Sequence, residues 1–243
     1  MHRTICSGLC VALGMQFATP ALADDTGFEV IVIGERSGND SDYSALSVRM
    51  PLSASAGNDG RTAVEGLRLR FDVARSNYDT GYDGVPGGGA STTSRLLLSY
   101  GLPLSEMTTL TLIGGISHRE TQVRPVTKSS PADLDRTGLF VAAELEVVFS
   151  ASSDLQLLVE HDGTAGDFAA LTYLHGIGSV RIGPTFSYYS EDDYEVSRAG
   201  VVAAVDIAED AELRLTATQG WPSLSGASAD EVSSVQVQLR LAF

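Results

Sequence analysis

Apolar and polar residues alternate one by one along most of this chain, and a period of two is typical of β-strands rather than helices. The clearest case is the C-terminus, where Val235, Val237, Leu239, Leu241 and Phe243 alternate with Gln236, Gln238 and Arg240. The pattern recurs from Leu67 to Val73 and from Leu139 to Val147. Because successive side chains of a strand point to opposite faces, each segment has one apolar and one polar face.

Weaker copies of the same alternation complete a continuous series along the chain. The predicted strands are 28–34, 43–51, 67–73, 94–102, 108–118, 139–147, 155–162, 168–175, 180–189, 197–207, 212–221 and 235–243. No shift of composition separates one part of the series from another, so we expect a single all-β domain.

The first 23 residues have a different pattern, that of an export signal. Arg3 supplies a positive end, an apolar stretch runs from Ile5 to Phe17, and Ala21-Leu22-Ala23 forms a small-x-small cleavage site. The apolar stretch is shorter than the roughly 20 residues that a membrane-spanning helix needs. We therefore predict a signal peptide at 1–23 and a mature domain at 24–243.

Charge and cysteine content exclude several functions. Lys and Arg total 16 against 31 Asp and Glu, which gives a net charge of −15. A chain this acidic is repelled by phosphate backbones, so we expect no nucleic-acid partner. Both cysteines, Cys6 and Cys10, lie in the predicted signal peptide, which leaves the mature domain without a disulfide, a thiol nucleophile or a cysteine metal ligand. We expect no cofactor.

The lengths of the connections indicate which environment covers the apolar face. Connections after even-numbered strands are mostly tight, as at 103–107, 150–154, 176–179 and 208–211, with 52–60 somewhat longer. Those after odd-numbered strands include the two longest in the chain, 75–93 and 119–136. Short turns at one end and long loops at the other are typical of outer-membrane barrels, whose short turns face the periplasm. We predict a transmembrane antiparallel up-and-down β-barrel of about 12 strands with longer extracellular loops. A soluble β protein is the alternative.

The distribution of aromatic and charged residues supports the barrel. Aromatic residues prefer the interface between lipid and water. We expect two rings of them, Tyr43, Tyr78, Phe168, Tyr188 and Trp221 at the long-loop ends and Tyr100, Phe149 and Phe243 at the short-turn ends. The polar face carries charges of both signs, and the candidate lumen-facing residues are Arg68, Arg70, Asp72, Arg95, Glu144, Glu146, Glu160, Arg181, Arg214 and Arg240.

The export signal, the alternating last strand and the terminal Phe243 resemble Gram-negative outer-membrane proteins, in which a C-terminal aromatic residue is recognised by the barrel-assembly machinery. The stretch from Gly66 to Trp221 is similar to the bacterial cellulose-biosynthesis protein BcsS, a family of exported barrels. The similar segments are Gly66-Leu67-Arg68-Leu69-Arg70 running into Tyr78-Asp79, Leu98-Ser99-Tyr100-Gly101, Ile182-Gly183-Pro184, Tyr194 and Arg198-Ala199-Gly200. The resemblance implies a role in making or exporting cellulose or a related exopolysaccharide. It brings no catalytic residues.

Few residues could support an enzyme. Outside the predicted signal peptide the only histidines are His118, His161 and His175. Their sequence neighbours Ser117 and Asp162 must point to the opposite face of a strand, so neither adjacent pair can form a catalytic dyad. An enzyme would need a serine and a histidine to converge on one face near the outer rim. We predict no enzyme and no metal site.

The acidic and glycine-rich segments are better explained as loops than as binding sites. The clusters Glu191-Asp192-Asp193 with Glu195, and Asp133 with Asp135, can bind calcium loosely, but their spacing matches no ordered calcium loop. We interpret them as solvated outer loops. Gly87-Gly88-Gly89 lacks the lysine and the helix of a phosphate-binding loop.

Two roles therefore follow from the sequence. The first is a non-enzymatic outer-membrane accessory to exopolysaccharide synthesis or secretion, with a lumen plugged by pairing of its own charges. The alternative is a porin-like channel for oligosaccharides or other polar solutes, in which opposed charges hydrogen-bond the solute. For sugar stacking, the candidate platforms are Phe140, Tyr189 and Tyr78.

Overall fold

The computed structural model describes residues 27–38, 41–52, 66–79, 87–125, 133–150, 152–191, 194–224, 227–228 and 231–243. They form the strands β1 (Glu29–Ser37), β2 (Asp42–Pro51), β3 (Gly66–Asp79), β4 (Gly87–Ser105), β5 (Thr108–Pro125), β6 (Asp133–Ser150), β7 (Ser153–Asp162), β8 (Gly166–Ile177), β9 (Val180–Glu191), β10 (Tyr194–Ala208), β11 (Ala211–Leu224), β12 (Ala227–Ser228) and β13 (Val232–Ala242). The described residues contain no helix of the length and apolarity needed to cross a membrane. The predicted signal peptide lies outside them.

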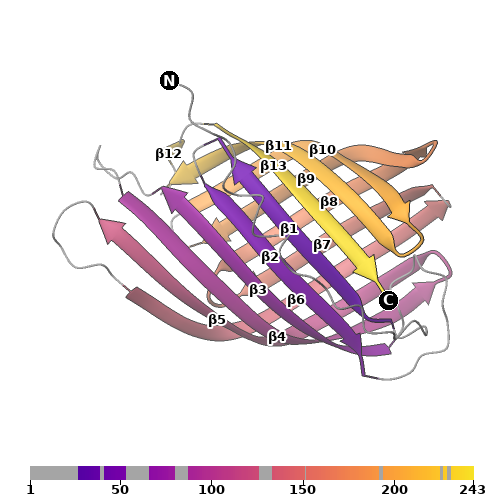
Figure 1. Cartoon of the computed structure of the whole chain (residues 1–243), viewed down its shortest axis with the longest axis horizontal. Helices are drawn as coiled ribbons and strands as arrows, with labels where there is room; N and C mark the ends of the chain where they lie inside the picture. The colour runs from indigo at the N-terminus through magenta and orange to yellow at the C-terminus, as the bar shows by residue number, and fades with distance from the viewer. Residues whose placement is uncertain are drawn as a thin grey trace.

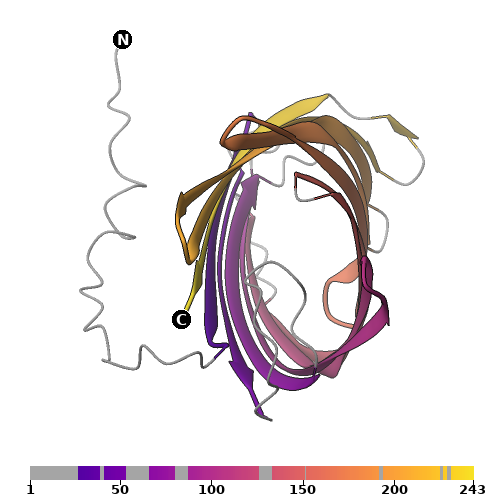
Figure 2. The same ribbon diagram turned by 90° about the vertical axis from the view of Figure 1, so that its right-hand side faces the viewer.

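The strands close into a ring of twelve, which confirms the predicted fold. Each strand pairs antiparallel with its sequence neighbour, β1 pairs with β13, and β11 lies between β13 and β10. The two-residue β12 is an appendage on the edge of β11. Figure 1 shows the strands tilted against the long axis of the barrel, and Figure 2 shows a ring that is flattened in cross-section.

The first and last strands close the barrel side by side. Their register runs from Glu29 opposite Ala242 to Ser37 opposite Ser234. Two backbone hydrogen bonds between Phe28 and Phe243 continue the ladder, and their rings pack at 5.8 Å. Both chain ends of the barrel therefore lie at the end with the short turns, here called the short-turn end; the opposite end is the long-loop end.

The apolar face of most strands points outward, although β1 also carries Ile31 and Ile33 on its inner face. Large apolar side chains such as Leu96, Leu98, Ile116, Val141 and Val237 are exposed on the outside of the ring. Their direct sequence neighbours, including Arg95, Ser117 and Gln238, point to the inside. A soluble barrel would bury its apolar face inside, so this arrangement is that of a barrel surrounded by lipid.

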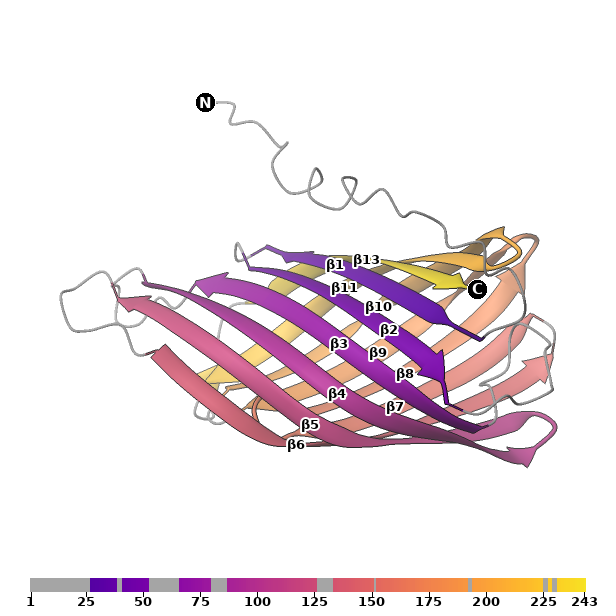
Figure 3. The same cartoon turned by 60° about the horizontal axis from the view of Figure 1, so that its bottom comes forward.

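The predicted lengths of two long loops, 75–93 and 119–136, are wrong. The segments 87–93, 119–125 and 133–136 are strand, so the connections between β3 and β4 and between β5 and β6 shrink to 80–86 and 126–132. At about 3.4 Å per residue the 19 residues of β4 measure about 65 Å. The roughly 10 residues that a strand needs to cross a bilayer measure about 34 Å. Outside the apolar band the alternation of polarity disappears while backbone pairing continues. Figure 3 shows β4, β5 and β6 projecting past the other strands.

The wall bends sharply at glycines on its inner face. A Cβ atom added to Gly115 would lie 2.2 Å from the carbonyl oxygen of Leu96, and one added to Gly200 would lie 2.0 Å from that of Ala217. These neighbours belong to the backbone of the adjacent strand, so no side chain can move to make room. Glycine lets neighbouring strands bend closely together where the barrel curves.

Candidate functional site

All ten candidate charged residues lie on the inner face of the barrel. Each alternates with an outward apolar neighbour, as Arg70 does with Leu69 and Phe71, and none belongs to the outward set. Their strands span the ring from β3 to β13. The described residues contain no group of three or more His, Cys, Asp and Glu side chains positioned to hold a metal ion.

One set of ion pairs occupies the short-turn half of the lumen on the β13, β1, β2 and β3 wall. Glu29 is buried and interacts with the guanidinium groups of Arg49, Arg68 and Arg240. Arg49 also reaches Glu144 on β6, with 3.7 Å between Nη2 and Oε1. Since β2 and β6 are four strands apart, that contact crosses the lumen rather than following the wall.

Arg70 and Arg240 extend the same set of charges. The Nε atom of Arg70 donates to Asp72 at 2.9 Å, and its Nη1 atom lies 3.7 Å from Glu144. Glu146 interacts electrostatically with Arg240. Glu160 lies farther toward the long-loop end and interacts with Arg95 and Arg70.

The opposite wall carries a second set. Arg181 donates to Asp154 at 2.9 Å and forms an ion pair with Glu212. Arg214 donates to Glu212 and to the side-chain oxygen of Gln156, both at 3.1 Å. The contact from β11 to Gln156 on β7 also spans four strands. Basic and acidic groups are thus paired on both walls, and the lumen carries charges of both signs throughout.

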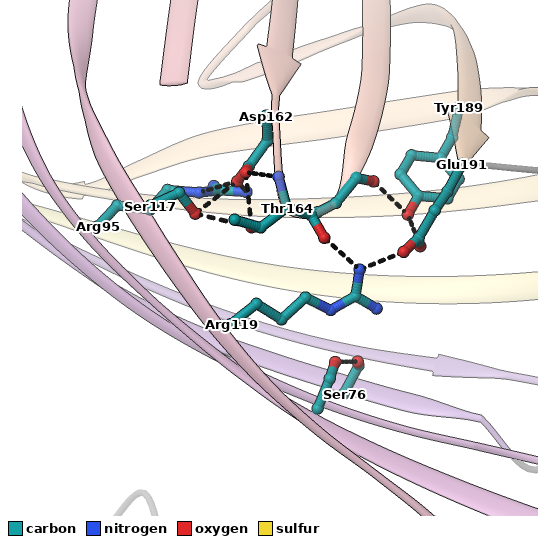
Figure 4. A network of polar contacts seen from close by, with 10 residues as sticks. Ser76, Arg95, Ser117, Arg119, Asp162, Thr164, Tyr189 and Glu191 are labelled. Carbon is teal, nitrogen blue, oxygen red and sulfur yellow. Dashed lines mark hydrogen bonds and ion pairs between the residues drawn. The ribbon is translucent and has the colours of Figure 1, made fainter. Parts of the chain in front are cut away.

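A third set of polar contacts lies toward the long-loop end and holds the β7–β8 turn (Figure 4). We call it the outer network, and its residues are Arg95, Ser117, Arg119, Asp162, Thr164, Tyr189 and Glu191. Asp162, only 2% exposed, receives hydrogen bonds at Oδ1 from the Thr164 backbone N–H at 2.8 Å and hydroxyl at 2.7 Å. Its Oδ2 atom accepts hydrogen bonds from the hydroxyl of Ser117 at 2.9 Å and from the guanidinium of Arg95 at 2.8 Å. The guanidinium of Arg95 also lies 4.8 Å above the ring of Phe140.

Arg119 continues the outer network across the lumen. Its Nη1 atom donates to the carbonyl oxygen of Thr164 at 3.2 Å and to Glu191 at 2.5 Å. The hydroxyl of Tyr189 lies 2.7 Å from the carbonyl oxygen of Ala165 and 2.5 Å from Glu191. The turn between β7 and β8 is therefore fastened to β4, β5 and β9 at once.

A pair of glycines lets the turn fold against the wall. Gly138 on β6 lies opposite Ser117 on β5, and a Cβ atom added to it would lie 2.9 Å from the backbone of Gly163. The N–H of Gly163 donates to the carbonyl oxygen of Leu139 at 2.9 Å. Absence of a side chain at Gly138 therefore opens the space through which Ser117 reaches Asp162.

Sequence reasoning missed several of these residues. Arg49, Arg119, Asp154 and Asp162 share the inner face with the ten candidates, and their parity within each strand is the signal that identifies them. Glu191, interpreted as part of a solvated acidic loop, is instead paired with Arg119 inside the barrel. Asp192 and Asp193 lie outside the described residues.

Three aromatic residues expected in the lipid-facing ring point inward instead. Tyr43 lies opposite Ser76, Tyr78 opposite Gly89, and Phe168 opposite Glu160, all on the inner face. An aromatic side chain indicates that its residue lies near the membrane surface. Whether that side chain faces the lipid or the lumen depends on the position of the residue in the alternation of its strand. Tyr188, Trp221, Tyr100, Phe149 and Phe243 are exposed on the outside. Phe140 was expected as a stacking platform, but it is 1% exposed and covered by Arg95.

The histidines do not meet. His161 lies 2.6 Å from Asp167 at the long-loop end of β7 and β8, whereas His175 lies 2.7 Å from the hydroxyl of Ser153 at their short-turn end. Both pairs are on the outer face, and Ser153 is buried. A nucleophilic serine also needs access to its substrate and an orienting partner for the histidine. Among the described contacts, His175 has no carboxylate partner.

The closed antiparallel wall, the apolar exterior and the charged lumen together define the class of this protein, which is a barrel of the outer-membrane type. No protein-family model matches the chain, and no relative was found among curated proteins. Solved structures do match it. The KdgM porin aligns with a TM-score of 0.50 at 9% identity, over 88% of this chain and 99% of that one; it has also been solved with disordered oligogalacturonate.

Two autotransporter domains have the same architecture. The translocator domain of NalP from Neisseria meningitidis aligns with a TM-score of 0.52 at 10% identity, over 91% of this chain and 90% of that one. The beta domain of the Bordetella autotransporter BrkA aligns with a TM-score of 0.50 at 12% identity, over 90% of this chain and all of that one. At such identities the likeness shows the fold alone.

Proposed function

We propose that this protein is an outer-membrane channel for small polar solutes. The observation that carries the proposal is the lumen itself, because its charged side chains remain in part exposed to water although they are paired. Arg240 is 42% exposed and Asp206 43% near the short-turn end, and Arg198 is 32% exposed in the other half. Partly hydrated charges on the wall of a closed barrel provide a polar path through an apolar membrane.

Lipid contact and assembly follow from the same proposal. The outward apolar band would lie in the hydrocarbon of the outer membrane, reached by export through the predicted signal peptide. Phe243 stands at the end of the strand that closes the barrel. We propose that it is read by the barrel-assembly machinery, and that no step of the function is enzymatic.

A second candidate is the plugged accessory role in exopolysaccharide export implied by the resemblance to BcsS. The observation in its favour is the outer network, in which Arg119 and the β7–β8 turn bridge strands on different sides of the lumen. A barrel closed in this way would act through partners such as a polysaccharide synthase or its secretion complex rather than through transport.

Swelling of liposomes separates the two roles. Vesicles containing the refolded protein are expected to swell in isosmotic glucose and more slowly in a larger neutral sugar, because a narrow charged lumen admits small polar solutes first. Arg119→Ala removes one bridge across the lumen and is expected to swell faster. Arg75→Ala, an outward residue of β3, is the control and should match the unmodified protein.

Absence of swelling in the unmodified protein would overturn the channel proposal in favour of the accessory role. If Arg119→Ala then swelled, the outer network would be identified as the plug. Faster swelling of both variants would show general leakage and would also contradict the proposal.

A further inference from the structure

The outer half of the lumen is lined by inward aromatic side chains, of which only Tyr189 takes part in the outer network. Tyr43, Tyr78, Phe168, Tyr189 and Tyr194 all occupy inner-face positions, and each is partly exposed. Lipid cannot reach them there. An aromatic ring presented to water inside a polar lumen is a surface for stacking rather than a membrane anchor.

Tyr78 has the geometry of a stacking platform. It lies directly opposite Gly89 across the β3–β4 pair. A Cβ atom added to Gly89 would lie 2.3 Å from Cε2 and 2.5 Å from Cζ of the tyrosine ring. The ring therefore lies flat over the glycine, with one face against the wall and the other toward the lumen. Covering a bare glycine with an aromatic ring also shields the backbone.

A second aromatic surface lies near Tyr78. The rings of Tyr189 on β9 and Tyr194 on β10 are 6.3 Å apart between centroids, at 57° to one another. Arg119 and Glu191 interact electrostatically with Tyr78. Glu191 also accepts a hydrogen bond from the hydroxyl of Tyr189, and Arg119 interacts electrostatically with that tyrosine. Tyr78 and the Tyr189–Tyr194 pair thus flank one ion pair at the outer mouth of the lumen.

The charges around these rings are balanced. Arg119 pairs with Glu191, Arg95 with Asp162, and Arg198 on β10 with Glu35 on β1 at 2.9 Å. Paired guanidinium and carboxylate groups offer both donors and acceptors to hydroxyl groups but no net attraction for an ion. A ring-shaped solute rich in hydroxyl groups and without charge matches both the rings and the charges.

We propose that the outer half of the lumen is a binding site for uncharged oligosaccharides, with Tyr78 as the stacking platform and the Tyr189–Tyr194 pair beside it. This inference rests on the proposed channel function and names its substrate class. Sugar rings would stack on Tyr78 while their hydroxyl groups exchange hydrogen bonds with Arg119 and Glu191.

Isothermal titration of the refolded protein in detergent with cellotetraose and maltotetraose tests the site without requiring transport. At least one of the two sugars is expected to bind saturably. Tyr78→Leu should weaken that binding about tenfold, which corresponds to the loss of one stacking contact of about 1.4 kcal/mol. Tyr188→Leu is the matched control, because Tyr188 is the sequence neighbour of Tyr189 but faces outward, and it should bind as the unmodified protein does.

Gly89→Ala provides a second variant that keeps every tyrosine. The new methyl group would occupy the place of the Tyr78 ring and displace it from the wall, so binding should again weaken. Absence of saturable binding, equal loss in Tyr188→Leu, or tighter binding of tetragalacturonate than of both neutral sugars would each overturn the proposal. Binding without liposome swelling would overturn the channel alone, and swelling without binding would overturn this site alone.

Discussion

Replacing Gly115 by alanine is expected to destabilise the folded barrel by about 3 kcal/mol, because the new Cβ would overpack a site bounded by backbone. Its position lies 2.2 Å from the carbonyl oxygen of Leu96 and 2.8 Å from the Cα atom of Leu97, so β4 and β5 would have to separate. Loss of that close approach would open the bend that brings β5 to β6. The measurement is urea unfolding in detergent, followed by heat-modifiable mobility on a gel.

Gly34→Ala is the matched control for this prediction. Gly34 lies in β1 on the outer face, and nothing lies within 4 Å of an added Cβ atom. A change within about 0.5 kcal/mol is expected there, since a surface substitution that creates no clash is nearly neutral. Equal destabilisation by both alanines would show that the bend at Gly115 carries no special cost.

Removing the carboxylate of Asp162 is expected to cost about 3–5 kcal/mol, the range seen when one partner of a buried ion pair is lost. Asp162→Ala would leave Arg95 without its carboxylate and the hydroxyls of Ser117 and Thr164 without their acceptor. Urea unfolding can be followed through the emission of Trp221, the single tryptophan, which is exposed on the outer surface.

Asp167→Ala is the control for this second prediction. Asp167 is only five residues away and also carries an ion pair, to His161, but its side chain is 64% exposed on the outer face. Exposed pairs contribute about 0–1 kcal/mol, so a small change is expected. If both aspartates gave the same small change, the outer network would not be the structural support of the β7–β8 turn.

The wall of the barrel was predictable from the sequence because its cause is local. Alternation in 235–243 places Val235, Val237 and Leu239 on one face whatever the rest of the chain does, and the same holds for most strands within the apolar band. The barrel was predicted from this alternation together with connections that are mostly tight after even-numbered strands, and the even number of strands placed both termini at the short-turn end. These features depend only on residues close in sequence.

The strand ends were less predictable because hydrophobicity stops marking a strand beyond the lipid. Residues 87–93 continue β4 through backbone pairing alone, with small and hydroxyl side chains that also suit loops. Tyr78 lies on the part of β3 beyond the predicted 67–73, so its facing required the longer strand. Tyr43 lies within the predicted 43–51, and its facing required only the parity that it shares with Arg49. Aromatic residues indicated a membrane surface, whereas register decided that these two face water inside the barrel.

The pairing of charged residues within the lumen could not be predicted from the sequence, for a different reason. Arg95 on β4 meets Asp162 at the end of β7, three strands away, beside the space that Gly138 leaves against Gly163. The sequence separation of these partners is 67 residues, and no local pattern encodes which arginine meets which carboxylate. The inner face was predictable as a set of charges, but not as a set of pairs.

Single-channel conductance of the refolded protein in planar bilayers tests the central claim most directly. We expect an open channel to show steady conductance with weak selectivity between anions and cations, because arginines and carboxylates are paired throughout the lumen. Arg119→Ala should raise that conductance, because it removes a bridge across the outer half. A folded, membrane-inserted barrel that carries no current in either form would contradict the account and leave the accessory role in its place.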